Sequence, residues 1–150
     1  MAPYLPTDCR ELLDRQRGVL ARWQAAPSGL DCSSIDNWVR RGRWQKLYFG
    51  VYADYTGEPA RDSLLWAALC RSGPGAALSH FTAAELDGIR GRRTEAIHVA
   101  VPGRRRARIA ESEYQTGLPR VVVHRSGRIG QARHPAKSPP RTRLEEYWVN

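Results

Sequence analysis

The order of helix-forming and strand-forming segments constrains the fold of this chain more than any other feature of its sequence. Helical segments are predicted at residues 8–16, 19–26 and 32–41, and glycine or proline separates each from the next. Residues 43–52 follow, rich in aromatic residues and with a glycine at position 50, and they predict a β-hairpin. Three short helices followed by a hairpin are typical of a winged helix-turn-helix.

The third predicted helix has an apolar inner side and a polar outer side. Ile35 and Val39 lie four residues apart and face inward together. Trp38 is predicted to be a packing residue and Trp44 a core anchor at the base of the hairpin. Asparagine can pair bidentately with adenine and arginine with guanine, and basic side chains contact phosphates. The predicted DNA-contacting residues are Ser33, Ser34, Asn37, Arg40, Arg41, Arg43 and Lys46. A second explanation stays open, because basic residues at a helix end also interact favourably with the helix dipole.

The remainder of the chain predicts a mixture of helices and strands. Helices are expected at residues 61–71 and 78–86, and strands at 96–101 and 120–125. Residues 127–140 are rich in Gly, Arg and Pro and predict a linker. The expected fold class is α+β, with an N-terminal winged helix-turn-helix followed by a small helix-and-sheet domain. The predicted domains are 1–58, 59–126 and 127–150, the last being a basic linker with the start of a truncated helix.

The charge of the chain favours a polyanionic partner. There are 24 Lys and Arg against 15 Asp and Glu, a formal net charge of +9. Residues 102–150 hold 11 basic and 4 acidic side chains, so most of the excess lies there. Such an excess is most often directed at nucleic acid, although an arginine-rich composition also follows from a high-GC genome. The candidates for clamping phosphates are Arg104, Arg105, Arg106 and Arg125.

The sequence offers no pattern for catalysis, a cofactor or a metal. It contains no GxxxxGK[ST] motif and no GxGxxG motif, the two glycine-rich patterns that bind nucleotides. It also has no histidines at metal-ligand spacing. His98 and His124 fall on the two predicted strands and could be neighbours, but they lack a nearby third ligand. Ser79 is expected to cap the helix that follows it rather than to act as a nucleophile. We therefore expect a protein that is not an enzyme and holds no metal and no cofactor.

Membrane insertion and disulfide bonding are not indicated either. No run of 18 apolar residues occurs, and the N-terminus lacks the apolar segment of a secretory signal. Cys9, Cys32 and Cys70 lie far apart, with no CxxC spacing. A cytoplasmic protein without a membrane partner is expected.

Five segments, read in order, resemble the N-terminal part of the AbiEi-type antitoxins and related actinobacterial transcriptional regulators. They are residues 13–25, 39–52, 73–84, 97–102 and 121–126, and the resemblance covers about residues 10–147. It implies a winged helix-turn-helix that represses its own operon in a type IV toxin–antitoxin system. It also implies antagonism of a nucleotidyltransferase-like toxin encoded next door. Family members usually continue into a second, larger domain on which antitoxin activity depends. For a chain that stops at Asn150, the resemblance therefore implies DNA binding more directly than toxin neutralisation.

The expected function is that of a DNA-binding transcriptional repressor. Its expected partner is a double-stranded operator with an inverted repeat, bound by a homodimer, because repressors commonly match two-fold operators with dimers. The alternative is a protein–protein interaction module, in which residues 60–126 dock a partner and the basic tail meets an acidic surface on it. Direct phosphate contacts predict an affinity that falls steeply with salt concentration. An apolar docking surface predicts an affinity that changes little with salt concentration.

Overall fold

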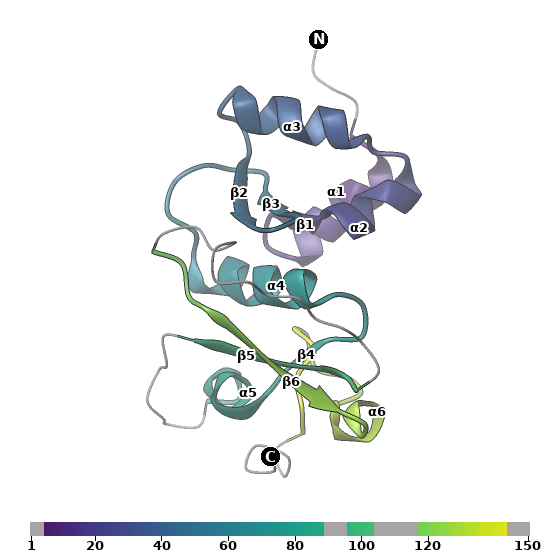
Figure 1. The fold of residues 1–150 in the computed structure, drawn as a ribbon, viewed down its shortest axis with the longest axis vertical. Coiled ribbons are helices and arrows are strands. Elements are labelled where there is room, and N and C mark those ends of the chain that lie inside the picture. The colour runs from purple at the N-terminus through teal and green to yellow at the C-terminus, as the bar shows by residue number, and fades with distance from the viewer. Residues whose placement is uncertain (1–4, 89–95, 104–116, 144–150) are drawn as a thin grey trace. The chain divides into compact units, whose positions relative to one another are not determined.

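The computed structural model describes residues 5–88, 96–103 and 117–143 (Figure 1). The fold is α+β, with short helices and two three-stranded sheets. The described residues up to Arg71 form a first compact unit, and those from Ser72 onward form a second. None of the helices in the described ranges has the length and apolar character needed to cross a membrane.

The first unit contains a three-stranded antiparallel sheet among its helices. The strand order is β1-β3-β2, and both neighbouring pairs are antiparallel. In chain order the elements are α1 (Thr7–Arg15), β1 (Val19–Ala21), α2 (Arg22–Ala25), the 3₁₀ turn η1 (Ala26–Ser28), α3 (Cys32–Arg40), β2 (Gln45–Tyr48), β3 (Val51–Ala53) and α4 (Arg61–Ser72).

The predicted helix over residues 19–26 is wrong in its first half. Val19–Ala21 is the strand β1, and only the residues after it are helical. All three residues of β1 are buried, and they pair with β3. The backbone amide of Arg22, the first residue of α2, donates a hydrogen bond of 2.9 Å to the carbonyl of Gly50 in the hairpin turn. Strand pairing with a distant segment therefore outweighs the local helix propensity of Leu20 and Ala21.

Helix α3 is anchored by apolar side chains and capped at its start. Ile35 and Trp38 are buried in the core of the first unit, and Val39 packs against that core. The ring of Trp38 lies 4.6 Å from that of Trp44, which is also buried, as predicted for both tryptophans. The Asp31 carboxylate accepts a hydrogen bond from the amide of Ser33 and so satisfies one of the free amides of the first turn.

Helix α4 is held to the first unit by two hydrogen bonds from side chains to backbone. Trp23 Nε1 donates to the carbonyl of Cys70 at 2.8 Å, and Ser63 Oγ donates to the carbonyl of Arg17 at 2.8 Å. The sequence places a domain boundary between residues 58 and 59, whereas the compact units divide after Arg71.

The second unit contains a mixed sheet in the order β4-β5-β6. β4 is antiparallel to β5, and β5 is parallel to β6 from the pair Ile97–Val121 to the pair Pro102–Ser126. The two long strands were predicted within two residues of their ends. The elements are β4 (Ala77–Leu78), α5 (His80–Leu86), β5 (Ile97–Pro102), β6 (Val121–Ser126) and α6 (Ile129–Ala132).

Two expectations for the second unit need correction. The predicted helix over residues 78–86 begins only at His80, because Leu78 pairs in β4. Residues 127–140 are not simply a linker, since they contain α6 and then return along β4. There, the amide of Leu78 donates to the carbonyl of Pro140, and the amide of Thr142 donates to the carbonyl of Leu78, each at 2.8 Å. This added backbone pairing buries Arg141 and Thr142.

A buried carboxylate makes the burial of Arg141 possible. Asp87 Oδ1 accepts hydrogen bonds from Arg141 Nη1 at 2.9 Å and from Lys137 Nζ at 2.7 Å. Arg141 also donates to the carbonyls of Ser138 and Pro139. A buried cation needs such partners, because an unpaired charge is costly to remove from water.

Candidate functional site

Helix α3 exposes a polar and basic face. Ser33, Asn37 and Arg40 are exposed at helical spacing, and Ser34 is partly exposed. The only carboxylate within α3, on Asp36, is paired with Arg22. Within α3 itself, the charge that remains on this face is therefore positive.

Three of these side chains already hydrogen bond, two to one another and one to the helix cap. Arg40 Nη1 donates to Asn37 Oδ1 at 3.2 Å, so the predicted adenine-reading and guanine-reading groups are neighbours. Ser33 Oγ donates to Asp31 Oδ2 at 2.7 Å and belongs to the helix cap. Hydrogen bonds from Ser33 lower the pKa of Asp31, which keeps this carboxylate charged.

The basic edge continues from α3 into the hairpin. Arg41 ends the helix, Gly42 adopts a φ of +74°, and Arg43 and Lys46 are exposed beyond it. The seven residues predicted to contact DNA thus follow one another from the first turn of α3 to β2. Six of them are exposed, with Ser34 the exception.

The tip of the hairpin carries an exposed aromatic ring that the sequence interpretation did not assign to the interface. Phe49 is 58% exposed, whereas its neighbour Tyr48 is buried. Lys46 Nζ lies 5.3 Å and Arg71 Cζ 5.6 Å from the centre of the Phe49 ring, within the range of cation–π attraction. The available signal is the predicted turn itself: Phe49 directly precedes Gly50, beyond the end of β2, and turn residues lie at the surface.

Three histidines gather in the second unit. His98 Nδ1 lies 3.0 Å from His124 Nε2, which confirms that the two strand histidines are neighbours. The ring of His80 stacks on that of His124 at a centroid distance of 4.0 Å, so a third imidazole is present after all. The three rings pack on one another instead of converging, and in the described part of the chain no three His, Cys, Asp or Glu side chains are arranged to hold a metal.

Burial controls the protonation of this cluster. Desolvation lowers the pKa of all three imidazoles, and the neighbouring rings lower the pKa of His98 and His124 further. For His124 the pKa falls to about 4. Ser79 occupies the position before α5, as predicted, but its hydroxyl lies 3.0 Å from His80 Nδ1 and makes no capping bond. His80 itself has a φ of +52°, a conformation that non-glycine residues rarely adopt.

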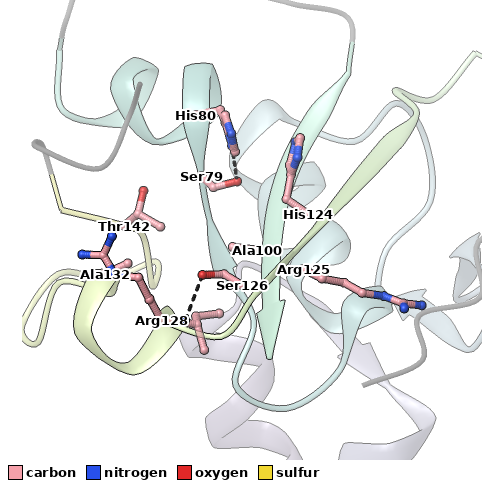
Figure 2. Close-up of a pocket in the computed structure, with 10 residues that line it drawn as sticks. Ser79, His80, Ala100, His124, Arg125, Ser126, Arg128, Ala132 and Thr142 are labelled. Atoms are coloured by element: carbon pink, nitrogen blue, oxygen red, sulfur yellow. Dashed lines mark hydrogen bonds between the residues drawn. The ribbon is translucent and has the colours of Figure 1, made fainter. Parts of the chain in front are cut away.

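A cavity of about 150 Å³ adjoins this cluster (Figure 2). Figure 2 shows Ser79, His80 and His124 together at one end, with Ser126, Arg128 and Thr142 further along. The lining residues are Ser79, His80, Ala100, His124, Arg125, Ser126, Arg128, Ile129, Ala132 and Thr142. Sequence reasoning found Arg125 alone among these as a site residue, because the parallel pairing of β5 with β6 and the return of the C-terminal segment bring the others together.

The predicted phosphate-clamp residues are placed only in part. Arg125 lies on β6 and is exposed, and its guanidinium points away from Ser79 and His80 in Figure 2. Arg104, Arg105 and Arg106 lie outside the described residues.

Comparison with protein-family models and with curated protein sequences found no significant match.

Proposed function

We propose that the first unit is a winged helix-turn-helix that binds double-stranded DNA, and that the protein acts as a transcriptional repressor of the antitoxin type. The element order α1, β1, α2, α3, β2, β3 and the sheet order β1-β3-β2 support this assignment. In this motif the helix after the turn enters the major groove, and the hairpin contacts the neighbouring backbone.

The exposed face of α3 is the observation that carries the proposal. Asn37, Arg40 and Arg41 take no part in the core, and the carboxylate near them is neutralised by Arg22. Asn37 would pair with adenine and one of the arginines with guanine. Arg43 and Lys46 would hold phosphates, which fixes the register of the protein on DNA without reading its sequence. The proposal extends to a homodimer on an inverted repeat, in the cytoplasm, with a nucleotidyltransferase-like toxin as functional partner.

The test measures binding to a duplex from the promoter of the protein's own gene, by fluorescence anisotropy at several salt concentrations. Replacing Arg40 and Arg41 together by Ala should lower specific affinity by about 100-fold or more, because each base contact contributes about 1–3 kcal/mol. The matched control replaces Arg10 and Arg15, two exposed arginines of α1, and removes the same charge. It should retain the preference for the promoter.

The dependence of the affinity for DNA on salt concentration is the second measurement. Direct phosphate contacts give a log–log slope of about −0.9 for each phosphate neutralised. Equal affinity and preference in the two double variants, or an affinity that does not respond to salt, would contradict the proposal.

A further inference from the structure

The cavity of the second unit has the chemistry of an anion site. Among the described residues that line it there is no carboxylate, whereas Ser79 and Ser126 bring hydroxyls to it, His80 and His124 bring imidazoles, and Arg128 brings a guanidinium. Hydroxyl, imidazole N–H and guanidinium groups are all donors that suit a phosphate.

Arg128 brings a cation to the cavity: it is one of the lining residues, and Figure 2 shows its side chain on the side of Ser126 and Thr142. Thr142 lines the cavity as well, but its Oγ1, which has no hydrogen-bond partner in the described part of the chain, has almost no accessible surface and so does not open onto the cavity.

The imidazoles serve such a site in their neutral form. The hydrogen bond between His98 Nδ1 and His124 Nε2 requires one nitrogen to accept, so at least one of these two rings is neutral. A neutral imidazole still has one N–H with which to donate. The third ring, that of His80, is oriented by a hydrogen bond between its Nδ1 and the Ser79 hydroxyl, which are 3.0 Å apart.

We propose that this cavity binds a single phosphate group, presented by a mononucleotide or by the end of a nucleic-acid strand. The size fits this reading, because a cavity of about 150 Å³ holds one small ring or one compact anion but not a whole nucleotide. Ala100, Ile129 and Ala132 form its apolar part. The site belongs to the second unit alone and does not depend on DNA binding by α3.

The test uses the full chain and calorimetric titration with inorganic phosphate, thymidine 5′-monophosphate and thymidine. The two phosphates should bind saturably, and thymidine should not. Ser126→Ala and Arg128→Gln should each weaken phosphate binding by about tenfold, the effect of removing one hydrogen bond to a charged group. Arg133→Gln is the matched control, an exposed arginine of the same segment that does not line the cavity, and it should bind phosphate normally.

Thermal unfolding separates a binding role from a structural one. Arg128→Gln replaces an exposed side chain, so the Tm of the ligand-free protein should stay near that of the wild type while its phosphate affinity falls. A lower Tm of this variant together with unchanged phosphate affinity would overturn the proposal. So would the absence of saturable binding of both phosphates at millimolar concentration.

The source of the phosphate is found with short duplexes that carry either a 5′-phosphate or a 5′-hydroxyl. Tighter binding of the phosphorylated duplex, lost in Arg128→Gln, assigns the site to strand ends. Equal binding of the duplexes, with retained binding of thymidine 5′-monophosphate, assigns it to a small molecule. The Arg40/Arg41 double variant should bind inorganic phosphate as the wild type does, so failure of the DNA proposal and failure of this one can be told apart.

Discussion

Arg22 Nη2 lies 2.6 Å from Asp36 Oδ1, an ion pair that joins α2 to α3 across the turn between them. The two side chains are 37% and 51% exposed, so Asp36→Asn should lower the free energy of unfolding by less than about 1 kcal/mol. Arg22 Nε also donates to the hydroxyl of the buried Tyr52 at 2.7 Å. Tyr52→Phe should cost more, about 1–3 kcal/mol, because it leaves a partly buried donor unsatisfied. Urea unfolding followed by tryptophan fluorescence measures both, and a larger loss for Asp36→Asn would contradict this ranking.

Gly18 and Gly29 share nearly the same backbone conformation, with φ of +83° and +82°, but not the same surroundings. A Cβ at Gly18 would lie 2.7 Å from Asp54 Oδ1 and 2.9 Å from Tyr55 Cε1, whereas a Cβ at Gly29 has nothing within 4 Å. Gly29→Ala should therefore cost about 1–2 kcal/mol, the penalty of the left-handed conformation alone. Gly18→Ala should cost clearly more in the same urea experiment. Equal losses would show that the residues around Gly18 move aside without penalty.

Asp87 should be among the most sensitive positions of the second unit. Its side chain is 9% exposed and bonds to both Lys137 and Arg141, so Asp87→Asn leaves the buried Arg141 without its counter-ion. We expect a loss of about 3 kcal/mol, the lower end of the range for breaking a buried ion pair. Lys137→Gln is the control, because Lys137 is 36% exposed and can be hydrated, and it should cost less than about 1 kcal/mol. Thermal unfolding by circular dichroism measures both variants, and similar losses would refute this difference.

The histidine cluster makes the stability of the second unit depend on pH. The pKa of His124 is about 4 in the folded protein, compared with 6.5 as its ordinary value, so the unfolded chain takes up this proton first as the pH falls. The stability that neutral His124 contributes is present above about pH 6.5 and is lost as the pH falls toward 4. His124→Gln should therefore flatten the decline in stability between pH 6.5 and 5. The titration of His124 followed by NMR is the direct check, and a midpoint near 6.5 would contradict the prediction.

Local sequence patterns predicted the longer elements of the fold. The apolar spacing of Ile35 and Val39 located α3, and the Val-rich segments located β5 and β6, because a single face or a continuous apolar run specifies these elements. The strand at Val19–Ala21 was missed because three residues carry too little local signal. Its conformation depends on pairing with β3, about thirty residues away.

The two candidate sites differ in how far sequence could predict them. The face of α3 follows from helical periodicity once Ile35 is placed inward, so its exposed residues could be named in advance. The cavity of the second unit could not be predicted from the sequence. His80, His124 and Thr142 meet there only through parallel strand pairing and the return of the chain along β4. The segment that returns had the composition of a linker, and its burial depends on a carboxylate fifty residues earlier.

The hydrogen bond from the Arg22 amide to the Gly50 carbonyl joins the first residue of α2 to the turn of the hairpin. A displacement of that turn would strain this hydrogen bond, and a shift of the start of α2 would in turn strain the ion pair with Asp36 in α3. The positions of the hairpin and of α3 are therefore coupled, by about 1 kcal/mol, the strength of one backbone hydrogen bond or one exposed ion pair. A partner that shifts the hairpin would also favour a shift of α3.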